Sequence, residues 1–226
     1  MTGVYLLNKS KLIGNMLLLL TSIIWGSAFV AQRVGMDYVG PLTFCASRFI
    51  LSALVLIPVM HFLGRGSKKQ QLEQNGYTVE KKRIFLPEDM DERKTLIKAG
   101  IICGSILFCG STLQQFGLVF TTAGKAGFIT ALYIVLVPVF SLFLRRIPGV
   151  KCWIGVAFGA VGPYLLCITE AFTIAPGDLV VLIGAGFWAV HLLAIDHFLC
   201  RKVDAIKLSF LQFSVCAIFG TIAAIL

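Results

Sequence analysis

The polar side chains that could do chemistry in this chain are few, and they lie inside long apolar segments. Arg48 is the most exceptional, because it is a permanent charge about two helical turns inside an apolar stretch. A charge at membrane depth costs several kcal/mol unless it is paired or hydrated. We therefore expect Arg48 to bind an anionic group or a carbonyl in a cavity, or else to extend its guanidinium to the lipid–water interface.

Three neutral amides are further candidates for a cavity. Gln114 and Gln115 end one apolar segment, and Gln212 lies inside another. A neutral amide orients a polar solute without the cost of burying a charge, but it can equally form hydrogen bonds between helices. Both interpretations stay open for these residues.

His191, Asp196 and His197 lie in the second half of one apolar segment. A histidine and a carboxylate within a membrane helix can relay a proton. The alternative for Asp196 and His197 is an interfacial position at the helix end, whereas His191 lies deeper.

Aromatic residues lie too deep in their segments for an interfacial belt. Trp25 and Trp188 each follow about a dozen residues of apolar sequence. They would line a cavity, where an indole stacks on organic solutes, or pack between helices. The same two roles apply to Tyr133.

Small and helix-bending residues predict packing features. Pro138 lacks an amide N–H and favours a kink, either as a hinge or as a static bend. Gly155 and Gly159 have the spacing of a close helix-packing face.

Signatures of enzymes and of bound cofactors are missing from the sequence. There is no phosphate-binding Gly-x-x-x-x-Gly-Lys-Ser/Thr, no His-Glu-x-x-His and no Gly-x-Ser-x-Gly. The seven cysteines include no Cys-x-x-Cys pair. We expect no catalytic residue, no cofactor and no metal site.

The elements that position these residues must be membrane helices. Of 226 residues, 58% are hydrophobic and 14% are charged, whereas about a quarter are charged in a typical soluble domain. One soluble core cannot bury that excess. We expect an all-α, polytopic helical bundle of about seven spans, over residues 13–32, 42–63, 96–116, 126–144, 153–168, 179–199 and 205–226. The polar stretch 64–94 is predicted to be a loop.

The distribution of charged residues along the chain predicts how the chain is oriented across the membrane. The net charge of +9 lies in the gaps between apolar segments. This pattern favours contacts with membrane lipids rather than with nucleic acid. Every second gap is basic, which predicts a multi-pass protein of the plasma or inner membrane with a cytoplasmic N-terminus.

An internal repeat links the two ends of the chain. The spacing from Gly14 to Trp25 equals that from Gly177 to Trp188, and Arg48-Phe49 corresponds to Gln212-Phe213. An odd number of predicted spans separates the two copies. The copies therefore cross the membrane in opposite directions, which is the arrangement of many secondary transporters.

Several ordered segments resemble the EamA domain of the drug/metabolite transporter superfamily. They are residues 24–30, 41–44, 48–49, 123–132, 137–140 and 155–162. The resemblance implies ten helices in two inverted five-helix repeats around a central cavity. Residues 1–175 would be the first repeat, with a cytoplasmic loop at 64–94, and 176–226 the first two helices of the second. The expectation is then a truncated form, or helices completed by another subunit.

The function expected from this resemblance is secondary transport. The chain would act as a permease or exporter of small organic metabolites, such as amino acids or drugs, by alternating access. Its partners would be the solute, membrane lipids, and a second copy or a complementing subunit. The alternatives are an incomplete, non-transporting membrane subunit and an intramembrane enzyme that acts on lipid through His191, Asp196 and His197.

Overall fold

The chain is all-helical over the residues that the structure describes. The computed structural model describes residues 2–75, 85–87, 89–167 and 175–226, and side-chain surroundings within 11–62, 85–87, 89–161 and 175–226. Its helices are α1 (Thr2–Gly35), α2 (Pro41–Asn75), α3 (Met90–Val119), α4 (Ala123–Ala131), α5 (Tyr133–Phe143), α6 (Val150–Cys167), α7 (Pro176–Leu199) and α8 (Ala205–Ile225). The predicted all-α class is confirmed.

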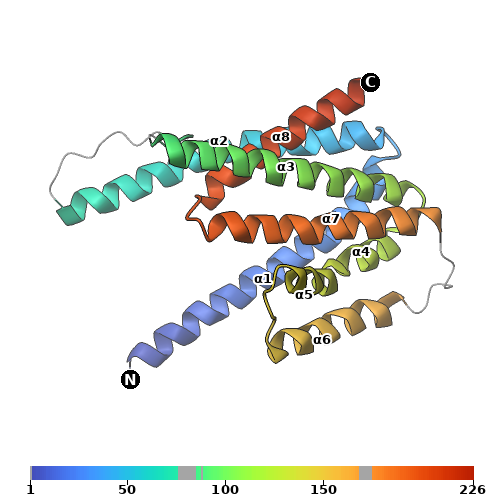
Figure 1. Cartoon of the computed structure of the whole chain (residues 1–226), viewed down its shortest axis with the longest axis horizontal. Coiled ribbons are helices and arrows are strands. Elements are labelled where there is room, and N and C mark those ends of the chain that lie inside the picture. The colour runs from blue at the N-terminus through green and yellow to red at the C-terminus, as the bar shows by residue number, and fades with distance from the viewer. Residues whose placement is uncertain (1, 76–84, 88, 168–174) are drawn as a thin grey trace.

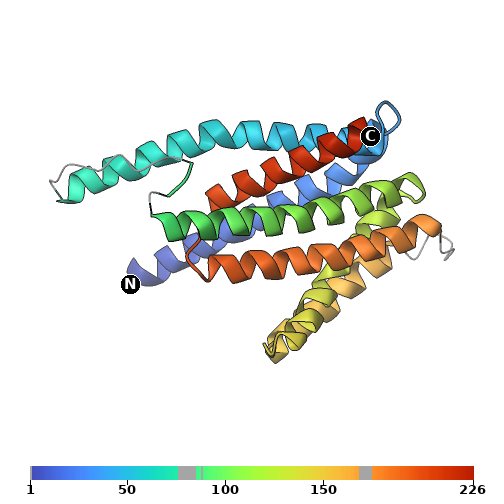
Figure 2. The same cartoon turned by 45° about the horizontal axis from the view of Figure 1, so that its top comes forward.

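Four helices form the centre of the bundle. α3 packs against α7 and α8, and α2 packs against α8. Figure 1 shows α2, α3 and α7 along the long axis, with α1 and α8 inclined to them and α2 and α8 running in opposite directions. In Figure 2, α4, α5 and α6 project from the side of α7.

Six helical segments are long and apolar enough to cross a membrane, counting only the described residues. They are Lys11–Gly35, Pro41–Phe62, Met90–Val119, Ala123–Phe143, Pro176–Leu199 and Ala205–Ile225, with mean hydropathies from 1.8 to 2.2. Helices suit this environment because they satisfy their backbone hydrogen bonds internally. The part of α6 with described side chains, Val150–Val161, is shorter. The predicted end of that span, at residue 168, lies outside the described residues.

The polar stretch after the second span differs from the prediction. α2 continues as helix to Asn75 instead of ending in a loop near residue 64. Residues 68–74 are lysine, glutamine, leucine and glutamate, which have high helix propensity and extend a helix that is already nucleated. α3 then begins at Met90, where the side chain of Asp89 accepts a hydrogen bond from Glu92 N. Residues 76–84 and 88 of the predicted loop lie outside the described residues.

The fourth predicted span is interrupted. The helix breaks at Leu132 between α4 and α5, and Pro138 lies buried inside α5. Proline cannot donate the backbone hydrogen bond to the carbonyl four residues earlier, at Ile134. The break therefore comes just before the turn that the proline weakens.

Paired glycines bring α3 and α7 into backbone contact. A Cβ atom on Gly117 would lie 2.8 Å from the carbonyl oxygen of Gly177, and one on Gly184 would lie 3.3 Å from that of Gly110. In a membrane the hydrophobic effect does not drive helices together. Small residues favour their association because they let the two backbones pack closely. This approach fixes how α7 is rotated against α3.

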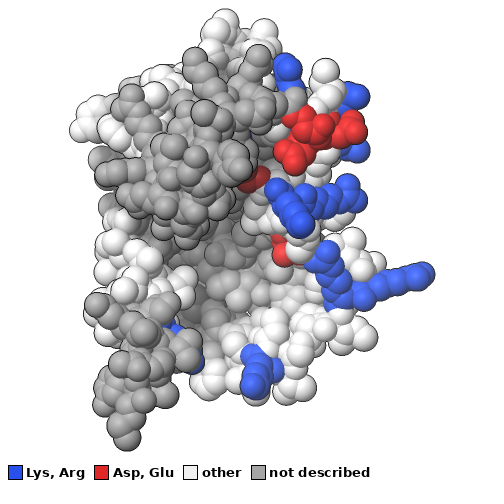
Figure 3. All heavy atoms as spheres, turned by 90° about the vertical axis from the view of Figure 1, so that its left-hand side faces the viewer, with Lys and Arg blue, Asp and Glu red and all other residues white. Residues whose placement is uncertain are grey.

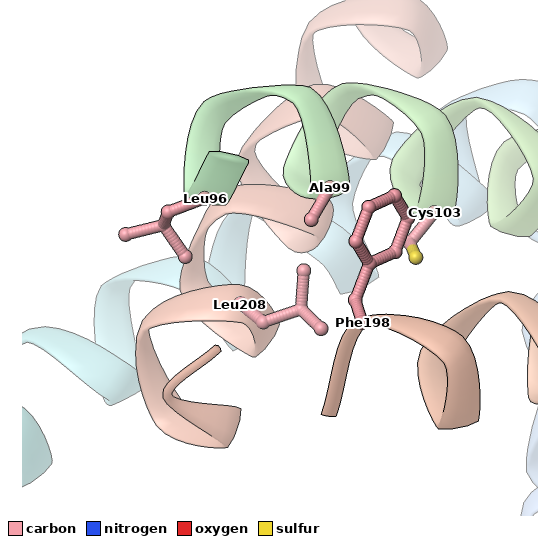
Figure 4. Packing of buried hydrophobic residues seen from close by; sticks show 5 residues of the cluster. All are labelled: Leu96, Ala99, Cys103, Phe198 and Leu208. Carbon is pink, nitrogen blue, oxygen red and sulfur yellow. The ribbon is translucent and has the colours of Figure 1, made fainter. Parts of the chain in front are cut away.

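Apolar clusters fill the spaces beside this contact. Figure 4 shows one of them, in which Leu96, Ala99 and Cys103 of α3 meet Phe198 of α7 and Leu208 of α8. All five side chains are buried. The cluster joins the three helices near one end of the bundle.

That same end carries most of the exposed basic charge. Figure 3 shows lysine and arginine side chains, with a few acidic ones, gathered where α3 begins and α7 ends. The exposed basic residues in the connections and helix ends here are Lys94, Lys98, Arg145, Arg146, Lys151, Arg201 and Lys202. The apolar spans are thus bounded by a basic rim on one side.

Candidate functional site

A line of polar side chains passes through the bundle from α1 to α8. We call Gln32, Gln114, Trp188, His191 and Gln212 the polar seam. Trp188 Nε1 donates a hydrogen bond to Gln114 Oε1 at 2.8 Å, and Gln114 Nε2 lies 3.5 Å from Gln32 Oε1, a long polar contact. His191 Nε2 lies 3.0 Å from Gln212 Oε1. The seam therefore connects four helices, α1, α3, α7 and α8.

The seam also runs obliquely through the depth of the bundle. Gln32 lies three residues before the end of α1, whereas Gln212 is the eighth of the 21 residues of α8. The rings of Trp188 and His191 join the two hydrogen-bonded pairs, with centroids 5.9 Å apart in an edge-to-face contact. Polar groups at successive depths are what a path for a polar solute requires.

Gln32 is a seam residue that sequence reasoning missed. It is 5% exposed, and its Nε2 donates to the Ala28 carbonyl at 3.1 Å. The available signal was its spacing of seven residues from Trp25, which puts both on one helix face.

Two aromatic pairs among the residues matched by the internal repeat lie in ring contact. The rings of Trp25 and Trp188 are 5.9 Å apart at 61°, and those of Phe49 and Phe213 are 5.9 Å apart at 38°. Residues related by a two-fold axis touch each other only where they lie close to that axis. The two contacts bring α1 against α7 and α2 against α8 at these rings.

Arg48 lies half-buried on α2 without an acidic partner. No carboxylate among the described residues lies within ion-pair distance of it, since the ion pairs found there involve other residues. Its guanidinium is 5.0 Å from the centroid of the Phe49 ring. The Cys45 side chain lies beside both Arg48 and Thr112, so Arg48 is near α3.

Several buried polar atoms lack a hydrogen-bond partner among the described residues. Gln115 is 1% exposed, and both of its amide atoms are unpaired. The other such atoms are Ser111 Oγ, Thr112 Oγ1, Thr130 Oγ1 and His191 Nδ1. A buried donor or acceptor left unpaired costs about 1–3 kcal/mol. The described protein groups therefore leave the hydrogen-bonding capacity of these buried atoms unused.

The histidine of the seam has a defined hydrogen-bonding state. An amide oxygen only accepts, so Nε2 of His191 carries the proton that it donates to Gln212. In the neutral ring Nδ1 is then an acceptor, and this is the atom without a partner. His191 can therefore accept one hydrogen bond from a solute.

The remaining predicted residues lie outside the seam. Tyr133 begins α5 and makes no hydrogen bond or ring contact with seam residues in the described part of the chain. A Cβ atom on Gly159 would lie 3.4 Å from Ile134 Cγ2, whereas one on Gly155 would meet nothing within 4 Å. Of this glycine pair, only Gly159 packs against another described helix.

Polar contacts hold α7 near both of its ends. At its start Asp178 accepts hydrogen bonds from Thr121 Oγ1 and from Ala175 N. Near its end Asp196 pairs with Arg146, which follows α5. Asp196 and His197 are exposed near the end of α7.

Together the fold and the seam define a polytopic helical membrane protein with polar groups among its central helices. The sequence model of the EamA-like transporter family matches residues 12–168. The chain belongs to this family, and it is a multi-pass protein of the cell membrane.

Curated relatives carry transporter names. The chain is 29% identical over 203 residues to an uncharacterized transporter of Archaeoglobus fulgidus, covering 89% of this chain and 54% of that protein. It is 26% identical over 172 residues to the uncharacterized inner membrane transporter YedA of Escherichia coli K12, covering 74% and 48%. The chain thus spans about half the length of the curated relatives it matches. No solved structure gives a significant match.

Proposed function

We propose that this chain forms part of a secondary carrier that moves small organic metabolites, such as amino acids or drugs, by alternating access. The observation that carries the proposal is the ring contact between Trp25 and Trp188, one from each copy of the repeat. Trp188 also belongs to the polar seam through its hydrogen bond to Gln114. Inverted repeats that meet at a polar site can rock against each other around a bound solute.

In this proposal residues 1–175 are the first repeat and 176–226 begin the second. The basic rim faces the cytoplasm, with the N-terminus on that side, in accordance with the distribution of lysine and arginine. The partners are the solute, the surrounding lipids, and either a second copy or a complementing subunit that supplies further helices. The carrier has no enzymatic step.

The contacts of the ionisable residues favour a carrier over an enzyme that acts on lipid. His191 is bound to Gln212 inside the bundle, whereas Asp196 is paired with Arg146 at its edge. His197 is exposed and lies against Phe198. The three residues therefore take separate partners and form no joint acid–base group.

Flux across a reconstituted membrane tests the proposal. Purified protein in liposomes would be screened for uptake and efflux of labelled amino acids and other metabolites, beside Arg48→Ala. We expect saturable flux that is lost in the variant. Folded protein that moves none of these solutes would contradict the proposal for this chain alone.

A further inference from the structure

The charge of Arg48 is uncompensated by protein groups that the structure describes. Arg48 is the eighth residue of the span Pro41–Phe62, and no carboxylate of the described chain pairs with it. A permanent charge at this depth is expensive unless an opposite charge or water neutralises it. The position is therefore favourable for an anion.

The helix next to Arg48 is α3, and three hydrogen-bonding side chains lie within about one turn of it. Ser111, Thr112 and Gln115 carry buried polar atoms that make no hydrogen bond to a described residue, apart from the contact of Thr112 with the weakly bonding Cys45 thiol. The side chain of Cys45 lies beside both Thr112 and Arg48, which brings this turn of α3 next to the guanidinium.

The free hydroxyls are unlike others on the same helix. Ser105 Oγ donates to the Ile101 carbonyl and Thr95 Oγ1 to the Asp91 carbonyl, each at 2.8 Å. This bond to the preceding turn is the usual way for a helical hydroxyl to satisfy itself. Ser111 and Thr112 make no such bond; Thr112 lies beside the thiol of Cys45, which is only a weak hydrogen-bonding group, and Ser111 Oγ has no partner among the described residues.

We propose that Arg48, Ser111, Thr112 and Gln115 form the subsite that binds the carboxylate of the transported solute. The guanidinium presents a planar fork of N–H donors that matches a carboxylate. The two hydroxyls and the Gln115 amide add uncharged donors. A carboxylate balances the single charge of Arg48, whereas a phosphate dianion would leave a buried negative charge.

Apolar neighbours strengthen this interaction. Phe49, Leu107 and Cys216 are buried in one cluster with Cys45. Low polarity around the site makes each charge-assisted hydrogen bond stronger than it is in water. The subsite would therefore discriminate an acid from an uncharged solute of the same shape.

The inference rests on the proposed carrier function, but binding can test it without transport. The probes are phenylalanine, benzoate and phenylacetate, each beside its primary amide, which keeps the shape and removes the negative charge. Binding to the full chain in detergent would be followed by calorimetry, and flux by liposome assays. The variants are Arg48→Gln and Arg48→Lys, with Arg33→Gln as a control that removes a charge from an exposed pair at the end of α1.

We expect at least one acid to bind at least tenfold more tightly than its amide. Arg48→Gln should remove that preference, while Arg48→Lys retains part of it and Arg33→Gln all of it. Equal binding of acids and amides, or no binding of any acid by folded protein, would overturn the subsite. Flux of the amides that saturates at the same concentrations as flux of the acids would overturn it while leaving the carrier function intact. Selective binding of acids without flux would support the subsite and contradict the carrier function.

Discussion

Trp25 and Trp188 lie edge to face, with ring centroids 5.9 Å apart, although 163 positions separate them in the sequence. The two indole rings differ in hydrogen bonding and in exposure. Trp188 donates its indole N–H to Gln114, while Trp25 is 47% exposed and makes no side-chain hydrogen bond among the described residues. Trp188 therefore connects the repeat contact to the polar seam.

This difference predicts unequal effects of the same substitution. Trp188→Phe keeps an aromatic ring but leaves Gln114 Oε1 without its donor, so it should destabilise the protein by about 1–3 kcal/mol. Trp25→Phe removes no hydrogen bond and is the matched control. Thermal unfolding of both variants in detergent checks this, and equal losses would show that ring packing alone matters.

The bond between His191 and Gln212 predicts coupling between α7 and α8. His191→Leu and Gln212→Leu each leave a buried polar group unpaired, whereas the double variant leaves neither. The double variant should therefore lose less unfolding free energy than the two single variants lose together, by about 0.5–1.5 kcal/mol. Additive losses in this double-mutant cycle would mean that the hydrogen bond contributes nothing.

The sequence predicts which residues are unusual better than it predicts their partners. Depth within an apolar segment identifies Arg48 and His191, and the repeat relates Trp25 to Trp188. The partner of His191 follows from how α7 and α8 are rotated, and that rotation is set by glycine contacts between helices.

The environment of residues near the ends of apolar segments is harder to predict from the sequence. Gln32 was missed because a glutamine there is ordinary at an interface, and its burial follows from the packing of α1 on other helices, including the contact with Gln114 of α3. Polar composition does not predict the helical extension of α2, whereas the helix propensity of residues 68–74 does. Both errors concern segments whose neighbours decide their environment.

The glycine contacts between α3 and α7 predict a position-dependent response to added bulk. Gly117→Ala would place Cβ 2.8 Å from the Gly177 carbonyl oxygen, so the helices must separate. We expect clear destabilisation, of about 1–3 kcal/mol. Gly155→Ala meets nothing within 4 Å and should be neutral or stabilising by up to about 1 kcal/mol, because alanine is the better helix former. Unfolding of the two variants in detergent compares them, and similar losses would argue against close packing of α3 on α7.

The proposed orientation predicts which cysteines react from each side of the membrane. Cys152 and Cys200 are exposed and adjoin Lys151 and Arg201 of the basic rim, whereas Tyr38 is 84% exposed in the connection after α1. In variants that keep one cysteine at a time, a membrane-impermeant maleimide should label Cys152 and Cys200 in inside-out vesicles but not in intact cells. Tyr38→Cys in a cysteine-free background is the control, and it should show the opposite pattern because the two sites lie at opposite ends of the spans. Labelling of Cys152 and Cys200 in intact cells would instead place the basic rim outside and reverse the proposed topology.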